Sequence, residues 1–152
     1  MIRILVADDD KEDIEIFSDA VKELNIDADI QVVRDGRQLL DLLSCDKEDK
    51  PDYLFLDLNM PKLSGFECLN HVRRHCDFDC MKIIILSGSV NVGEIDDAYD
   101  LGANYFLTKP SDLSEFKAYL LHIFNNKSTT PPSRAEFVLR HQHIKAMISH
   151  YP

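Results

Sequence analysis

The chain has 152 residues and carries 17 basic against 27 acidic side chains, a formal net charge of −10. Its hydrophobic content of 45% is enough to form the core of one ordinary domain. The acidic balance argues against non-specific nucleic-acid binding and against docking on an anionic membrane. No apolar run of the sequence approaches the roughly 18 residues that span a bilayer, and the first ten residues lack the pattern of a signal peptide. We therefore expect a cytoplasmic protein that has neither nucleic acid nor membrane as a partner.

The cysteines agree with a cytoplasmic location. A chain of this length with its own core does not need a disulfide framework. We expect free, reduced thiols at the four cysteines, which show no CxxC spacing: Cys45, Cys68, Cys76 and Cys80.

Apolar runs and helical patterns alternate along the first 124 residues. Alternation of this kind is typical of a parallel sheet whose right-handed crossovers place helices on both faces. The sequence therefore predicts an α/β fold, a doubly wound five-stranded parallel sheet with five flanking helices. In chain order the predicted strands are 2–7, 30–33, 53–56, 82–86 and 105–107, and the predicted helices are 10–24, 39–43, 66–73, 95–101 and 113–124.

The composition changes after residue 124. Residues 1–124 form the predicted domain, and the polar, proline-bearing residues 125–132 predict a linker. We expect residues 133–152 to form a helical C-terminal extension. Ser133 and Glu136 fit a helical capping box, with Phe137, Ile144 and Ile148 on one helical stripe. This extension is too small to hold a core alone. Residues 127–152 carry a net charge of +3 against −13 for the rest, which favours docking of this helix on an acidic surface of the same or a second molecule.

Charged and polar residues follow four of the predicted strands: Asp8-Asp9-Asp10, Asp57, Ser87 and Lys109. The carboxyl ends of parallel strands meet at one edge of the sheet, where ligands bind. Carboxylates crowded there repel one another unless a cation joins them, and a hard divalent ion, Mg²⁺ by preference, takes oxygen ligands. A carboxylate nucleophile, a metal, a hydroxyl and an ammonium are the parts that phosphoryl transfer needs.

Four segments together carry a family resemblance: ILVADDD, LDLNMPKLSGFE, ILSGS and FLTKP. In this order they resemble the receiver domain of two-component response regulators, of the stand-alone, CheY-like type, over roughly residues 2–124. The resemblance implies the flavodoxin-like receiver fold and a phospho-accepting signalling protein. Such a protein is not an enzyme in the ordinary sense, although it assists its own phosphorylation and dephosphorylation.

The resemblance also implies a phosphorylation site. Asp57 would accept a phosphoryl group from a partner histidine kinase or phosphotransfer protein. Asp9 and Asp57 would bind Mg²⁺ directly, together with the main-chain carbonyl of Asn59, and Asp8 would act nearby through water. We expect Asp10 to belong instead to the first turn of the following helix.

Further roles come from the same resemblance. Lys109 would pair with the phosphorylated carboxylate, and the Ser87 hydroxyl would move to a phosphoryl oxygen. Phe106 takes the position of the switch aromatic, which would turn inward as Ser87 moves. Pro110 would follow a cis peptide bond, and Gly65 fits the turn after the phosphorylated residue.

The output of such a receiver would be a downstream protein partner. The expected surface is the face of the fourth helix, fifth strand and fifth helix, and this face or the C-terminal extension could also pair two copies as a homodimer. The alternative function is a receiver-like interaction scaffold that is not phosphorylated, against which intact Asp57, Ser87 and Lys109 argue. Gly88 departs from the alanine that is common in the family and leaves the site more open.

Other classes fit the sequence less well. A haloacid-dehalogenase-type phosphatase needs a second aspartate where Asn59 stands, a flavodoxin needs a phosphate-binding loop where this chain has acids, and a P-loop is missing from the sequence. Arg73-Arg74 is interpreted as a solvated helix face, and the histidines of the extension (His141, His143, His150) as fortuitous composition or an interaction helix. A zinc site is disfavoured because no second ligand pair accompanies His71, His75, Cys76 and Cys80.

Overall fold

The structure, a computed structural model, describes residues 1–45, 50–140 and 144. His141, His143, Ile148 and His150 lie outside these residues, so what the sequence suggests for them stays a prediction.

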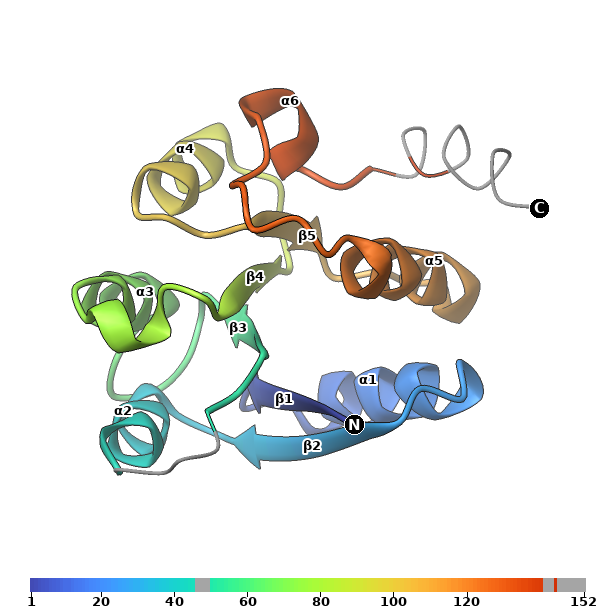
Figure 1. The fold of residues 1–152 in the computed structure, drawn as a ribbon, viewed down its shortest axis with the longest axis horizontal. Helices are drawn as coiled ribbons and strands as arrows, with labels where there is room; N and C mark the ends of the chain where they lie inside the picture. Colours follow the sequence, from blue (N-terminus) through green and yellow to red (C-terminus); the bar gives the residue numbers. More distant parts are fainter. Residues whose placement is uncertain (46–49, 141–143, 145–152) are drawn as a thin grey trace.

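The described residues form one five-stranded parallel sheet with strand order β2-β1-β3-β4-β5 (Figure 1). This confirms the predicted doubly wound sheet. Strand β2 starts two residues earlier than the alternation indicates, because Ala28 still pairs with Ile2 of β1. The strands are β1 Ile2–Ala7, β2 Ala28–Val33, β3 Tyr53–Asp57, β4 Lys82–Ser87 and β5 Tyr105–Thr108.

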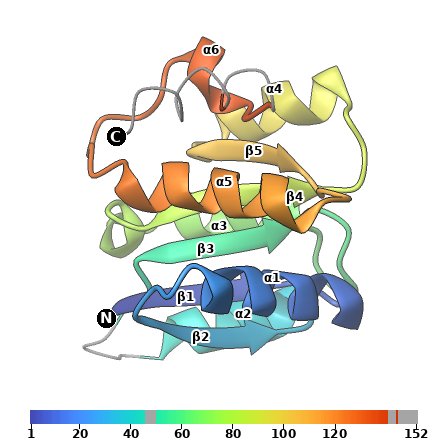
Figure 2. The same cartoon turned by 90° about the vertical axis from the view of Figure 1, so that its right-hand side faces the viewer.

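Helices cover both faces of the sheet, as Figures 1 and 2 show. Helices α2, α3 and α4 lie on one face, and α1 and α5 lie on the other. All five predicted helices are confirmed, with bounds that differ by a few residues. The helices are α1 Lys11–Glu23, α2 Gly36–Ser44, α3 Gly65–Arg73, α4 Val92–Asp100, α5 Leu113–Asn125 and a short α6 Arg134–Phe137, with a 3-10 turn at Cys76–Phe78.

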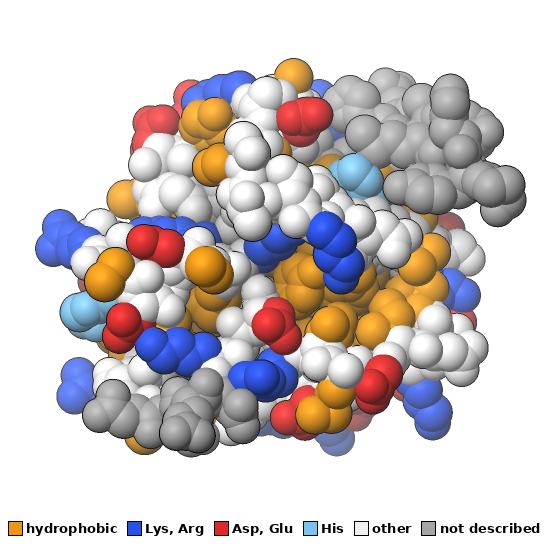
Figure 3. Space-filling view, viewed as in Figure 1, with side chains coloured by type: hydrophobic (Ala, Val, Ile, Leu, Met, Phe, Trp, Pro, Cys, Tyr) orange, Lys and Arg blue, Asp and Glu red, His pale blue; other side chains and the backbone are white. Residues whose placement is uncertain are grey.

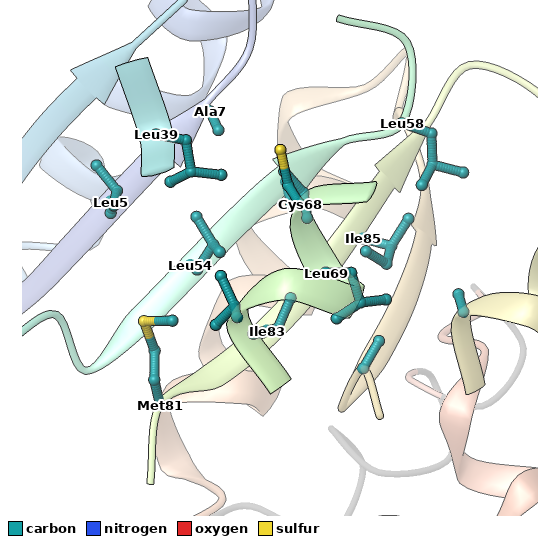
Figure 4. Packing of buried hydrophobic residues seen from close by; sticks show 14 of the residues in the cluster. Leu5, Ala7, Leu39, Leu54, Leu58, Cys68, Leu69, Met81, Ile83 and Ile85 are labelled. Atoms are coloured by element: carbon teal, nitrogen blue, oxygen red, sulfur yellow. The ribbon is translucent and has the colours of Figure 1, made fainter. Parts of the chain in front are cut away.

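The core divides into two apolar clusters, one on each face. Because β3 lies at the centre of the sheet and is covered on both faces, all five of its residues are buried. Figure 4 shows Leu39 of α2 and Leu69 of α3 packed over Leu54 and Ile83 of the sheet. A continuous apolar run is the pattern expected of a strand with two covered faces.

Polar side chains cap the amino ends of several helices. Asp10 accepts hydrogen bonds from the amides of Glu12 and Asp13, which confirms that it belongs to the start of α1. Gly102 ends the helical region of α4 with φ +95°, a left-handed conformation that favours glycine.

Arg73 corrects one interpretation. Its guanidinium donates to the carbonyls of Gly102, Phe78 and Met81 and to Oδ1 of Asn104, at 2.8–2.9 Å. Arg73 therefore joins α3 to the loops that precede β4 and β5 and is not part of a solvated basic face, whereas Arg74 is exposed.

Residues 133–140 of the C-terminal extension lie against the β5 edge of the sheet, beside α4 (Figures 1 and 2). Ser133 and Glu136 form the expected capping box. The helix ends at Phe137, however, and Val138 then forms a parallel bridge with Phe106. A single helix from 133 onward is thus wrong, because backbone pairing with the open edge of β5 takes over.

The surface carries charges of both signs. Figure 3 shows basic and acidic side chains interspersed on the face seen in Figure 1, with hydrophobic side chains between them. The four cysteines are free, as expected. None of the helices in the described ranges is both long and apolar enough to cross a membrane.

Candidate functional site

Parallel pairing brings the ends of four strands together. Ala7 pairs with Leu56, so Asp8 and Asp57 follow from neighbouring strands at the same level. Ser87 of β4 pairs with Thr108 of β5, which is followed by Lys109. The same edge of the sheet therefore holds the residues that the sequence predicts there: Asp8, Asp57, Ser87 and Lys109.

Three carboxylates meet there. Asp8, Asp9 and Asp57 each offer one ligand oxygen, and these oxygens lie within 4.8 Å of one another. Asp8 and Asp57 are buried, whereas Asp9 is exposed. Three converging oxygen donors that would otherwise repel one another suit a hard divalent cation. Asp10 points away into the cap of α1, so it does not belong to this group.

Burial changes the acidity of the central carboxylate. It raises the pKa of Asp57 to about 6, and the charge of Asp8 adds to the rise. A hydrogen bond of 3.2 Å from the amide of Asn59 and the nearby Lys109 oppose it. In the absence of a cation, Asp57 is thus held in an environment that disfavours its charge.

The ammonium of Lys109 is shared among carboxylates. Its Nζ lies 2.6 Å from Asp13, 3.1 Å from Asp8 and 3.4 Å from Asp57. Burial alone would lower the pKa of Lys109, but these three acids together raise it, so the side chain stays charged. The arrangement places a fixed positive charge beside Asp57.

Ser87 is fully buried and bonded to its own loop. Its Oγ donates to the carbonyl of Ser89 at 3.0 Å and accepts from the Ser89 amide at 3.3 Å. The next residue, Gly88, is exposed, and a Cβ built there would meet nothing within 4 Å. The loop above Ser87 is therefore open, as the glycine indicates.

Gly65 holds the loop after Asp57 close to β3. A Cβ at Gly65 would lie 2.4 Å from the carbonyl oxygen of Asp57 and 2.7 Å from Cα of Leu58. The Gly65 amide donates to the Leu58 carbonyl at 3.0 Å. Only glycine permits this approach.

The same loop is tied to the start of α2. Nζ of Lys62 lies 3.0 Å from the carboxylate of Asp35, and the Gly36 amide donates to the Pro61 carbonyl. Asp35 is buried and also caps α2 through the Gln38 amide. Hydrogen bonds from the Gln38 amide and Lys62 keep the pKa of Asp35 below its usual range.

Two expectations at β5 need correction. The peptide bond between Lys109 and Pro110 is trans, which is the preferred isomer even before proline; Lys109 is placed by its carboxylate partners and by an amide bond of 2.7 Å to the Ser87 carbonyl. Phe106 is already fully buried, so it has no exposed position from which to turn inward.

Sequence reasoning missed Asp13, the residue nearest to the Lys109 ammonium. An acid in the first turn of a helix is expected from the helix dipole alone, so the acidic side chain of Asp13 does not by itself indicate a site residue. Its position, one helical turn after Asp9, is the signal that could have found it. The pairing of Lys62 with Asp35 was also missed, because it joins two loops distant in sequence.

The histidine pair on α3 is set apart from this site. The rings of His71 and His75 lie 5.1 Å apart, and both residues are exposed. Neither belongs to the carboxylate cluster described above. The structure thus places them on a helix surface.

Comparison with protein families gives one clear match. The family model for the response regulator receiver domain matches residues 4–121, more than three quarters of the chain.

Similar proteins agree with this match. Response regulator Rcp1 of Synechocystis sp. is 29% identical over 74% of this chain and 79% of its own length. Response regulator MprA of Mycolicibacterium vanbaalenii is 33% identical over 88% of this chain but 54% of its own length, so the chain spans about half of that relative.

Solved structures show the same fold. The Mn²⁺-bound form of response regulator Rcp1 has a TM-score of 0.74 at 27% identity, over 88% of this chain and all of that one. The phosphorylated cyanobacterial phytochrome response regulator RcpA has a TM-score of 0.74 at 30% identity, over 87% of this chain and 99% of that one.

Proposed function

Because this chain belongs to the response regulator receiver domain family of two-component signalling, we propose that it accepts a phosphoryl group on Asp57 and signals through contacts with other proteins. The observation that carries the proposal is the meeting of Asp8, Asp9, Asp57 and Lys109 at one edge of the sheet. The phosphorylated relative RcpA supports it.

The chemistry is a phosphoryl transfer from a phosphohistidine. A carboxylate oxygen of Asp57 forms a bond to phosphorus while the phosphorus–nitrogen bond breaks, and the imidazole leaves with its electron pair. Lys109, already 3.4 Å from Asp57, would balance charge on the phosphoryl oxygens. In this way the chain assists its own phosphorylation and, with water as the acceptor, its dephosphorylation.

The carboxylates fit a divalent metal. Asp9 and Asp57, with the main-chain carbonyl of Asn59, would hold Mg²⁺ directly, and Asp8 would do so through water. When bound, Mg²⁺ supplies positive charge to the phosphoryl oxygens. The exposure of Asp9 beside buried Asp8 and Asp57 supports this role, since it leaves the cluster open to solvent.

The switch would run from Ser87 to Phe106. The Ser87 hydroxyl would leave Ser89 for a phosphoryl oxygen, and Phe106 would respond through the paired strands β4 and β5. Pro110 would keep its structural role after Lys109 with a trans bond, and Gly65 would hold the loop after Asp57.

Phosphorylation by a small donor tests the proposal. Acetyl phosphate with Mg²⁺ should add one phosphoryl group, seen by intact mass, and Asp57→Asn should abolish it. Asp19→Asn, an exposed acid of α1, is the matched control. Labelling of the Asp57→Asn variant at the wild-type level would refute the site, and labelling unchanged by EDTA would refute the metal.

The partner in this proposal is a histidine kinase or phosphotransfer protein, together with a downstream protein. Because RcpA is a phytochrome response regulator, a kinase of the phytochrome class is the first donor to test. The free cysteines support a cytoplasmic location. A receiver domain at 1–124, a linker at 125–132 and an extension at 133–152 belong to the same proposal.

A scaffold that is not phosphorylated is the competing function. A homodimer through the α4–β5–α5 face or the extension is the competing mode of output. Intact mass after treatment with acetyl phosphate decides the first alternative, and light scattering before and after phosphorylation measures the second.

A further inference from the structure

Residues 133–139, here called the strap, carry a phenylalanine that is fully buried although its helix has only four residues. The Phe137 ring lies 5.1 Å from Tyr99 of α4 in an edge-to-face arrangement and 6.4 Å from Phe106 of β5, centroid to centroid. Its exposed fraction is 0%, as is that of Phe106. An aromatic side chain with no exposed surface is a typical anchor of a bound segment.

The backbone of the strap extends the sheet. The Leu139 amide donates to the Phe106 carbonyl at 3.1 Å, and Val138 forms a parallel bridge with Phe106. Addition of a strand to an open sheet edge is a common mode of peptide recognition. Figures 1 and 2 show α6 beside α4, with the following segment along β5.

An ion pair and a cation–π contact hold the beginning of the strap on α4. Arg134 forms an ion pair with Asp96 of α4, and its guanidinium lies 5.0 Å from the Tyr99 ring centroid. Ser133 and Glu136 cap the short helix that joins this arginine to Phe137. The contacts of the strap are thus made by an arginine, a phenylalanine three residues later, and an extended backbone.

We propose that the α4–β5 edge is a peptide-binding site of this specificity, which the strap of the same chain fills in the unphosphorylated protein and which phosphorylation of Asp57 weakens. The site admits a partner segment with the same arrangement of arginine, phenylalanine and extended backbone only when the strap leaves. The weakening by phosphorylation rests on the function proposed above, whereas occupancy by the strap does not.

Contact between the two phenylalanines couples the strap to the switch. Phe106 and Phe137 are both fully buried with ring centroids 6.4 Å apart, so a movement of one ring changes the packing of the other. Phe106 pairs with Ile85, two residues before Ser87. A change at Ser87 that moves Phe106 must therefore disturb the strap.

Competition by a peptide tests the occupancy. A fluorescein-labelled peptide of residues 128–140 is titrated into the full-length chain, and binding is followed by anisotropy. A tethered strap competes at an effective concentration on the order of mM, so we expect the wild type to bind at least about tenfold more weakly than the Phe137→Ala chain. Ile16→Ala, on the exposed surface of α1, is the control and should behave as wild type.

A second variant keeps the test decisive if the Phe137→Ala chain misfolds. Arg134→Glu changes an exposed side chain and places like charge against Asp96, so it should also open the site to the peptide. A peptide carrying Phe137→Ala should bind neither variant. Equal peptide binding by wild type, Phe137→Ala and Arg134→Glu would refute the site.

Light scattering tests whether the strap lies on its own chain. A mass of two chains that falls to one in the Phe137→Ala variant would place the strap on a second copy and overturn the assignment to the same chain.

Hydrogen exchange tests the coupling. Phosphorylation, verified by intact mass, should speed exchange of the Leu139 amide at least about tenfold and weaken peptide binding to the Phe137→Ala chain. Phosphorylation without these changes would refute the coupling alone. Failure to phosphorylate would refute the proposed function, while the peptide titration still decides the occupancy.

Discussion

Among the single residues, Lys109 is central to the site, because its ammonium forms ion pairs with three acids. Asp13 is the nearest partner at 2.6 Å and Asp57 the farthest at 3.4 Å. Asp13 lies on a helix and is not part of the carboxylate cluster. It therefore competes with Asp57 for the ammonium without contributing to a cation site.

Removing the charge of Asp13 should release Lys109 toward Asp57. We expect Asp13→Asn to be phosphorylated by acetyl phosphate about two- to fivefold faster, the range that a partly exposed ion pair of 0.5–1 kcal/mol allows. Initial rates by intact mass measure the effect. Glu12→Gln, a neighbouring exposed acid, is the control, and a rate that falls in Asp13→Asn would show that Asp13 positions Lys109 productively.

Removing the charge of Asp57 should stabilise the metal-free protein at neutral pH. The pKa of Asp57 is about 6 in the fold against 3.8 in its ordinary state, so folding disfavours the ionised form. The stability present below about pH 4 is lost as the pH rises through 6 and remains lost at pH 7. We expect Asp57→Asn to raise the free energy of unfolding at pH 7 by about 1–3 kcal/mol.

Urea denaturation in EDTA measures this difference. The two proteins should converge near pH 3, which lies below both pKa values of Asp57, and Mg²⁺ should stabilise the wild type more than the variant. An equal gain at pH 3 and pH 7 would mean that packing, not charge, causes it.

The sequence predicts the acids at the strand ends, Asp8 and Asp57, but it does not predict the role of Asp13, the acid nearest to Lys109. Asp8 and Asp57 follow buried apolar runs, so their meeting follows from strand order alone. Asp13 depends on the rotation of α1 about its axis, which the packing of Phe17 on Phe55 fixes. The spacing of Asp13 from Asp9 is therefore a signal only once the orientation of this helix is known.

At the scale of elements, the loop between β3 and α3 is held from three sides. Gly65 contacts the backbone of β3, Lys62 pairs with Asp35, and Ser64 caps α3 together with Glu67. These contacts join the amino ends of α2 and α3 to Asp57. The position of Asp57 therefore depends on residues that never touch it through their side chains.

A methyl group at Gly65 should disturb this element, whereas one at Gly88 should not. Gly65→Ala brings a Cβ within 2.4 Å of the Asp57 carbonyl oxygen, so the loop must move. We expect a loss of about 1–3 kcal/mol in the free energy of unfolding and slower phosphorylation. Gly88→Ala, with no atom within 4 Å, is the control; equal melting temperatures of the two variants would contradict the close approach.

The strand boundaries predicted from the sequence match the structure where the strand is fully buried, and they differ from it elsewhere. All residues of β3 are buried, so the apolar run locates the strand. In β2, on the edge of the sheet, exposure alternates, and its first residues show no apolar signal. The extension departs most, because its path after Phe137 depends on a free edge of β5 that only the assembled sheet provides.

At the scale of the whole molecule, the strap closes one edge of the sheet. Phe137 joins the apolar cluster on the face of α2, α3 and α4, and Leu139 and Ile144 join the cluster on the face of α1 and α5. The opposite charges of the extension and the rest of the chain indicate docking on an acidic surface. The opposite charges alone do not predict docking at the edge of β5, because apolar packing and backbone pairing determine this position.

Truncation after Asn126 should therefore cost stability while the site stays intact. The buried side chains of Phe137, Leu139 and Ile144 are lost, and we expect the free energy of unfolding to fall by about 3–5 kcal/mol, the cost typical of deleting one large buried side chain. A chain ending at Arg140 keeps the strap and should lose less than half as much. Phosphorylation by acetyl phosphate should persist in both chains, because the site residues all precede the cut: Asp8, Asp9, Asp57, Ser87 and Lys109. The hydrogen-bond and ion-pair partners described above for these residues also lie outside the strap. Urea denaturation and intact mass measure the two effects; equal stability of the three chains would show that the strap is not bound, and loss of phosphorylation in the shorter chain would show that the strap supports the site as well as the sheet.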